Sequence, residues 1–250
     1  MLKKRIVPII LIQDSSIVKT VKFEDARIVG DLKSTIQVFA IRLADEICII
    51  DIEARKKKEI NFNIIEDIAK LANMPLTYGG YVNSLSSAKT LYNAGVDKLM
   101  LRTLIFENTK EVQKISDWFG YQSIIACVDY VGHGIEAKCV FGYNNKISSI
   151  GLFDYVKNLG NIGIGEILLN SIDRDGMMSG YDIETLKEIK LLTNLPIIIS
   201  GGCGKIEDIK SAFNSSASAI AAGSLFYWIG ESIISVKQEL HKSGIPVRLK

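Results

Sequence analysis

The chain has 250 residues, 48% of them hydrophobic, which is the usual size of one closed α/β barrel and is enough for a large core. Its 30 basic and 28 acidic residues give a formal charge of +2 and are spread along the chain, so they form no concentrated basic stripe for a nucleic acid. Because the first apolar run, residues 6–12, is too short to span a membrane and the four cysteines lack CxxC spacing, we expect a cytoplasmic protein with no membrane anchor and no nucleic-acid partner.

Short apolar runs rich in β-branched residues alternate along the chain with longer segments of helical period. Eight of these runs are predicted strands: Arg5–Ile12, Glu46–Ile52, Pro75–Tyr78, Lys98–Arg102, Ser123–Asp129, Glu166–Asn170, Pro196–Ser200 and Ala217–Ala222. Amphipathic stretches between them predict helices: Asn63–Ala72, Leu85–Ala94, Ile183–Leu192 and Ile206–Asn214. This alternation indicates a parallel sheet covered by helices, either a closed barrel or an open doubly wound sheet.

An internal repeat favours the closed barrel. Residues 73–80 match residues 194–202 with one residue inserted, and residues 102–104 match residues 223–225 at an offset of 121. Two halves, about 1–120 and 121–250, each carry four βα units. We therefore predict one domain over residues 1–250 with the (β/α)8 TIM barrel fold.

Two predicted loops are longer than such connections usually are. Residues 13–30 follow the first strand, and residues 130–150 follow the fifth. The second loop contains alternating apolar residues that suggest a small hairpin: Ile135, Ala137, Cys139 and Phe141. Because both loops follow the carboxyl ends of strands, which form the catalytic face of this fold, we expect them to cover or recognise a substrate.

Carboxylates follow three of the predicted strands. Asp129 ends the fifth strand, where partial burial suits a general acid or base, although a cap for the following loop is the alternative. After the sixth strand, Asp173 or Asp175 can face a ligand, and either can instead neutralise Arg174. Asp51 ends the second strand and can orient a substrate or cap the turn before Ala54.

Glycine-rich turns and cations at the same rim indicate an anionic substrate. Glycines permit close approach of the backbone to a phosphate, although a tight strand-to-helix turn also explains them. The predicted binding residues are Lys19, Asp51, Gly80, Arg102, Thr103, Gly176, Gly202, Gly204 and Ser224, with Lys22 as a further candidate clamp. His133 and His241 are isolated, so we expect no metal site and no cofactor.

Several segments together resemble the cyclase subunit of imidazole glycerol phosphate synthase, the histidine-pathway barrel that receives ammonia from a glutaminase. They are residues 5–8, 18–19, 165–169, 171–176, 179–182, 200–202 and 244–248. The resemblance implies an ammonia gate at the amino-terminal face, formed by Arg5, Glu46, Lys98 and Glu166. It also implies a heterodimer with a glutaminase subunit docked at that face.

The other face departs from the family pattern. Of the two acid/base aspartates that the resemblance implies, one matches Asp129, but the other falls on Leu11. Tyr81 replaces a third glycine and Arg102 replaces an asparagine, whereas the second half keeps Gly202, Gly204 and Ser224. A sugar or nucleotide-sugar could use Tyr81 for stacking and Arg102 for charge, so we expect a changed substrate.

Three hypotheses follow. The first is a divergent paralogue that works with a glutaminase and a sugar amidotransferase in the amidation of surface-glycan sugars. The second is the ordinary histidine-pathway cyclase, with Asp14 or Asp175 replacing the acid/base group lost at Leu11. The third is a non-catalytic scaffold that activates the glutaminase and passes ammonia to another enzyme.

Overall fold

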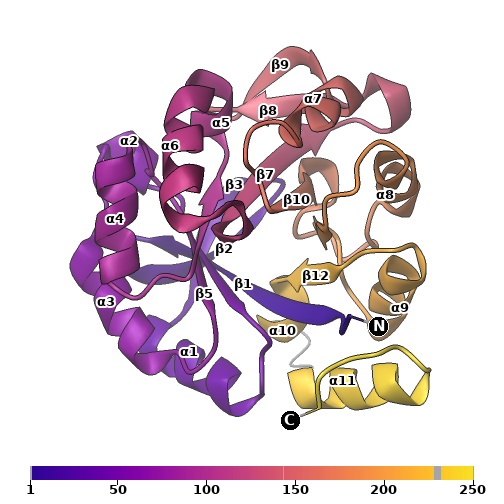
Figure 1. Cartoon of the computed structure of the whole chain (residues 1–250). Coiled ribbons are helices and arrows are strands. Elements are labelled where there is room, and N and C mark those ends of the chain that lie inside the picture. Colours follow the sequence, from indigo (N-terminus) through magenta and orange to yellow (C-terminus); the bar gives the residue numbers. More distant parts are fainter. Residues whose placement is uncertain (1, 143, 228–231, 250) are drawn as a thin grey trace.

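Eight parallel strands within the described part of the chain close into a barrel, and helices surround it (Figure 1). The computed structural model describes residues 2–142, 144–227 and 232–249. The barrel strands are β1 (Arg5–Gln13), β4 (Ile47–Asp51), β5 (Leu76–Gly79), β6 (Lys98–Leu101), β7 (Ile124–Val131), β10 (Glu166–Ser171), β11 (Ile197–Ser200) and β12 (Ala219–Ala222). Strand β1 pairs with both β12 and β4, and β10 pairs with both β7 and β11, so the ring is closed. The predicted (β/α)8 barrel is confirmed, and the open sheet is excluded.

Helices fill the connections between the strands. They are α1 (Leu32–Ile41), α2 (Ala54–Lys57), α3 (Phe62–Leu71), α4 (Leu85–Asn93), α5 (Thr103–Glu107), α6 (Thr109–Phe119), α7 (Leu152–Leu159), α8 (Ile183–Lys190), α9 (Ile206–Asn214), α10 (Ser224–Tyr227) and α11 (Ile233–Lys242). Side chains cap several amino ends: Asp31, Asn61, Asn108 and Asp182 each accept a bond from a backbone N–H three residues later. The four helices predicted from amphipathic stretches are confirmed.

The first long connection, predicted as a loop over residues 13–30, contains a hairpin that the sequence did not predict, and Gln13 belongs to β1. Strands β2 (Ser16–Val21) and β3 (Glu24–Gly30) pair antiparallel, and β2 also pairs with β1. The turn between them has Lys22 and Phe23 at φ angles of 52° and 66°, the left-handed pair that a tight hairpin requires. Neither residue is glycine or asparagine, so the usual turn signal is missing from the sequence.

The second long connection contains the predicted hairpin. Strands β8 (Lys138–Phe141) and β9 (Lys146–Gly151) pair antiparallel, and β8 extends the sheet from β7. Of the alternating residues that suggested it, Ala137, Cys139 and Phe141 are buried, whereas Ile135 lies in a 3-10 turn (Gly134–Glu136) and is exposed.

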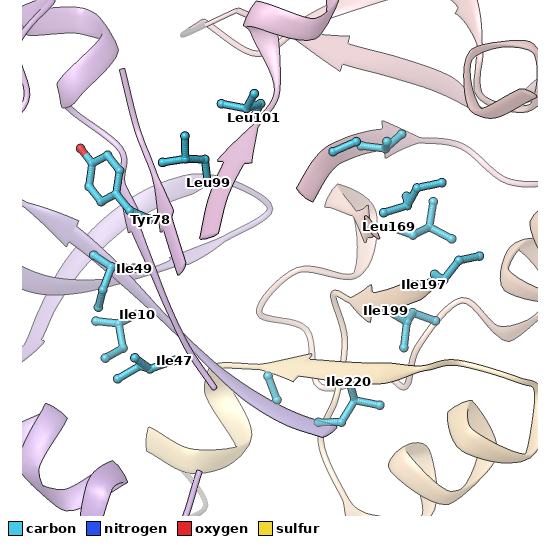
Figure 2. Packing of buried hydrophobic residues seen from close by; sticks show 14 of the residues in the cluster. Ile10, Ile47, Ile49, Tyr78, Leu99, Leu101, Leu169, Ile197, Ile199 and Ile220 are labelled. Atoms are coloured by element: carbon cyan, nitrogen blue, oxygen red, sulfur yellow. The ribbon is translucent and has the colours of Figure 1, made fainter. Parts of the chain in front are cut away.

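Alternating side chains divide the apolar residues of the barrel into two clusters. The larger cluster lies between the strands and the helices, and Figure 2 shows its members from β1, β4, β5, β6, β10, β11 and β12. The smaller cluster fills the barrel interior and consists of Val7, Ile9, Cys48, Met100, Ile125, Cys127, Leu168, Ile198, Ala219 and Ala221. The interior between the two ends of the barrel is therefore apolar.

A buried ion pair ties helix α11 to the amino-terminal end of the barrel. The ammonium of Lys237 donates to the Asp45 carboxylate and to the Leu43 carbonyl, both at 2.6 Å. The other oxygen of Asp45 accepts the backbone N–H of Ile6 at 2.8 Å. The side chains of Lys237 and Asp45 are only 3% and 5% exposed, so water cannot stabilise either charge if its partner is removed.

We expect Lys237→Met to lower the free energy of unfolding by about 3–5 kcal/mol, because it leaves the Asp45 charge buried without its partner. Urea unfolding followed by circular dichroism measures the change. The matched control is Lys33→Met, whose ion pair with Asp67 is exposed and should contribute much less to stability. Equal, small effects of both substitutions would contradict a structural role for the buried pair.

Candidate functional site

A cavity of about 290 Å³ opens at the carboxyl ends of the barrel strands. It brings together most of the predicted site residues: Lys19, Asp51, Gly80, Arg102, Thr103, Asp129, Asp175, Gly176, Gly202 and Ser224. Gly204 does not line the cavity, because its backbone packs against Met178 instead. Arg55, Asn145 and Asn170 also line it, and sequence reasoning missed all three.

Asp129 projects into the barrel mouth from β7 and is 3% exposed. Its Oδ1 accepts a bond from the Asn170 amide at 2.8 Å, and its Oδ2 accepts one from Arg102 at 2.5 Å. Arg102 also donates to the Gly142 carbonyl at 2.6 Å. Burial alone would lower the pKa of Arg102, but the adjacent Asp129 carboxylate raises it. The predicted carboxylate is therefore at the rim, and it is ion-paired there.

Leu11 lines the same cavity from β1, which lies across the barrel from β7. The two proposed replacements for a missing aspartate are placed differently. Asp14 forms an ion pair with Lys57 and lines a separate hollow outside the mouth. Asp175, in contrast, lines the mouth together with Leu11, and burial raises the pKa of its carboxyl group. Asp175 is thus the better placed of these two candidates.

The β2–β3 hairpin folds over the mouth and is fastened to the loop after β10. Thr20 Oγ1 donates to the Asp175 carboxylate at 3.2 Å, and the Lys22 backbone N–H donates to the Asp175 carbonyl at 3.0 Å. Gly176 permits this contact, because a Cβ there would lie 2.6 Å from the Thr20 carbonyl oxygen. The side chain of Lys22 is exposed and does not line the cavity.

Lys19 points from this hairpin into the cavity and is 8% exposed. Its ammonium lies 4.8 Å from the centre of the Tyr227 ring and 3.5 Å from the Ile9 carbonyl oxygen. Burial lowers its pKa to about 8, although the Asp175 carboxylate opposes the shift. The ammonium occupies the space where a side chain at Gly223 would begin, so Lys19 meets the turn that leads to Ser224. This convergence of a cation, glycine amides and a hydroxyl suits an anionic group.

Other polar residues of the rim have structural partners. Asp51 accepts bonds from the backbone N–H groups of Glu53 and Ala54, so it caps the following turn while also lining the cavity. Asp173 accepts the Gly132 N–H at 2.8 Å, and Arg174 donates to the Gly180 carbonyl. These contacts set Asp173 apart from Asp175, which the sequence alone could not do.

At the part of the rim formed by residues 1–120, the structure does not support the expectation that Tyr81 stacks on a substrate. The Tyr81 side chain packs against the main core and does not line the cavity. Gly80 and Thr103 do line it, and Arg55 adds a second guanidinium, paired with Glu107 at 2.6 Å.

At the opposite end, the four predicted gate residues meet inside the barrel. Arg5 pairs with Glu46 at 2.8 Å and also with Glu166, while Lys98 lies 2.9 Å from Glu46 and 3.2 Å from Glu166. Thr77, which sequence reasoning missed, donates to Glu46 at 2.7 Å. Burial opposes the charge of Arg5, but the two glutamates raise its pKa. The ring of charges is electrically balanced.

Residues 2–142, 144–227 and 232–249 contain no cluster of three His, Cys, Asp or Glu side chains that could hold a metal ion. None of their helices is both long and apolar enough to cross a membrane.

Known proteins resemble this chain over its whole length. Residues 5–229 match the family described as "Histidine biosynthesis protein". A Campylobacter jejuni protein named "Putative imidazole glycerol phosphate synthase subunit hisF2" is 37% identical over 252 residues, covering 100% of both chains. The Dictyoglomus turgidum "Imidazole glycerol phosphate synthase subunit HisF" is 36% identical over 251 residues, again covering 100% of both. A similarly named Leptospira borgpetersenii protein is 38% identical over 234 residues, covering 92% of each.

Lys19→Met should stabilise the protein near neutral pH. The buried lysine has a pKa of about 8 against an ordinary 10.5, so unfolding takes up a proton between these values and wild-type stability rises with pH across that window. Below about pH 8 the wild type bears the full cost of the buried charge, and we expect a gain of roughly 3 kcal/mol for the variant.

Urea unfolding at about pH 7 and about pH 9.5 tests this expectation, and the gain should shrink at the higher pH. Lys22→Met, in the same hairpin but exposed, should show no such pH dependence. A gain for Lys19→Met that is equal at both pH values would show that the lysine is not titrating.

Proposed function

The chain belongs to the histidine biosynthesis protein family, in company with the synthase subunits named HisF, and from this premise we propose an ammonia-using synthase. In this proposal a glutaminase partner supplies ammonia at the amino-terminal face, and the barrel conducts it to the mouth. There it reacts with a phosphorylated or nucleotide-linked substrate. The leading candidate role is the amidation of surface-glycan sugars, together with a sugar amidotransferase.

The observation that carries the proposal is the charged ring below an apolar interior. Arg5, Glu46, Lys98 and Glu166 balance one another at the base. In this proposal, movement of one of these side chains opens a path for ammonia. Beyond the ring, the interior is lined by Val7, Cys48, Met100 and their apolar neighbours. Such a lining favours neutral ammonia over the ammonium ion, because the charged form would lose its hydration.

Exposed apolar side chains at the amino-terminal face support the docking of a glutaminase there. They lie where helices end before the next strand begins: Ile41, Leu43, Trp118, Tyr121 and Leu191. Large apolar and aromatic side chains of this kind are typical of the centre of a protein interface. The word "subunit" in the relatives' names also fits a heterodimer.

The chemistry of the mouth favours a changed acceptor. Asp129 can transfer a proton, and Lys19 with the turn before Ser224 can bind an anionic group. Leu11 cannot transfer a proton, so one acid/base position has lost that function. A relative whose name carries the paralogue number hisF2 is consistent with a role outside the main pathway.

One observation supports the ordinary histidine-pathway cyclase as a second candidate. Asp175 shares the mouth with Leu11, and its raised pKa suits a general acid. Growth of a histidine auxotroph at a normal rate on expression of this chain would favour that role over sugar amidation.

We expect nitrogen from amide-15N glutamine to reach a product when the chain is combined with its glutaminase, a sugar amidotransferase and a nucleotide-linked sugar. Mass spectrometry follows the label. Asp129→Asn should lower the rate about 10²–10⁴-fold, the usual contribution of a general acid or base. Asp173→Asn is the matched control, since that carboxylate lies at the same rim but outside the cavity.

The possible results separate the hypotheses. Failure of the label to reach any product would overturn the proposed ammonia transfer. A labelled product formed equally well by Asp129→Asn would instead identify the chain as a scaffold for ammonia delivery.

A further inference from the structure

Arg102 connects three parts of the mouth that are distant in the sequence. It follows β6 at an interior position of the barrel, two residues after Met100. Its guanidinium donates to the Asp129 carboxylate at 2.5 Å, to the Gly142 carbonyl at 2.6 Å and to the Asn145 side chain at 3.3 Å. The same side chain lines the cavity, so a bound substrate can reach it.

Both oxygens of the Asp129 carboxylate accept hydrogen bonds from the protein. Oδ2 accepts a bond from Arg102, which also balances the negative charge, and Oδ1 accepts a bond from the Asn170 amide. To accept a proton from a substrate, the carboxylate must give up one of these contacts, and the contact with Arg102 is the one that a competing anion can replace. Asp129 therefore needs to lose Arg102 before it can act.

The same guanidinium holds Gly142 and Asn145, which lie between β8 and β9, at the rim. The backbone of Asn145 has a φ of 50°. The rest of the hairpin is fastened independently: β8 pairs with β7, and the ring of Phe141 stacks on that of Phe106 at 4.5 Å. Loss of the Arg102 contacts should therefore loosen the turn and leave the hairpin in place.

We propose that Arg102 is a specificity-determining residue that recognises a phosphate or carboxylate group of the substrate by exchanging Asp129 for that anion. The planar guanidinium binds either group through two parallel bonds, and a phosphate brings more negative charge than one carboxylate. Substrate arrival then frees Asp129 and the hairpin turn together. A substrate without an anion at this end leaves Asp129 paired and inactive. The role of Asp129 in proton transfer rests on the proposed function, whereas the exchange itself does not.

The exchange predicts that Asp129→Asn increases the affinity for an anion, because the competitor for Arg102 is removed. Inorganic phosphate is the probe, and isothermal titration calorimetry measures its dissociation constant. We expect binding about tenfold tighter than in the wild type, the equivalent of one charged hydrogen bond. Arg102→Asn should weaken binding about tenfold, and Asp129→Asn combined with Arg102→Asn should lose the gain.

Hydrogen exchange of β8 and β9 provides a second readout. Phosphate should speed exchange near the turn in the wild type, and Arg102→Asn should exchange rapidly with or without phosphate. Arg102→Lys keeps the charge without the two-pronged geometry, so its phosphate affinity should fall between those of the wild type and Arg102→Asn. Arg174→Asn is the matched control, because Arg174 lies at the same rim but outside the cavity and donates to the Gly180 carbonyl.

Three results would overturn the exchange: phosphate affinity in Asp129→Asn no tighter than in the wild type, a gain that persists without Arg102, or an unchanged hairpin in folded Arg102→Asn. Circular dichroism establishes folding of each variant. None of these measurements uses glutamine or a glutaminase. If Asp129→Asn binds phosphate more tightly than the wild type but no nitrogen reaches a product, the exchange stands and the proposed function is rejected.

Discussion

Four charges inside the base of the barrel neutralise one another, and this balance allows charged side chains to lie at the end of an apolar interior. Arg5, Glu46, Lys98 and Glu166 come from four different strand starts, so they meet only if the sheet closes in the observed register. Glu46 and Glu166 are buried, so each needs the partly exposed Arg5 and Lys98 to balance its charge. The ring therefore favours the closed barrel and at the same time separates the base from the apolar interior above it.

The charged side chains at the barrel mouth are also paired, but there they line the cavity. Asp129 is balanced by Arg102, and Asp175 lies near the buried Lys19, whose pKa is lowered to about 8. Leu11 faces this group of charges from the opposite side of the barrel and adds only apolar surface. In the proposed exchange, an anionic group of the substrate replaces Asp129 at Arg102.

The sequence predicts the barrel well because each strand carries its own apolar pattern, and all eight predicted strands are present within the described residues. The β2–β3 hairpin was missed because its turn uses Lys22 and Phe23 where glycine or asparagine is usual. Within the site, end-of-strand position identified Asp129. The contact of Arg102 with Asp129 has no local signal, because it depends on where β6, β7 and the β8–β9 turn meet in space. Asn170 could have been found from the alternation of side chains along its strand, because it lies two residues after Leu168 and four after Glu166, on the same interior face.

The most direct test of the account is a comparison of glutamine and added ammonium salt as nitrogen sources for Lys98→Met. If ammonia passes through the charged ring, this variant should lose about tenfold in glutamine-driven product formation but equal the wild type with ammonium, which reaches the mouth from solution. Lys114→Met, which breaks an exposed pair with Glu111, should behave as the wild type with both sources. An equal loss with both nitrogen sources, or no loss with glutamine, would contradict passage of ammonia through the charged ring.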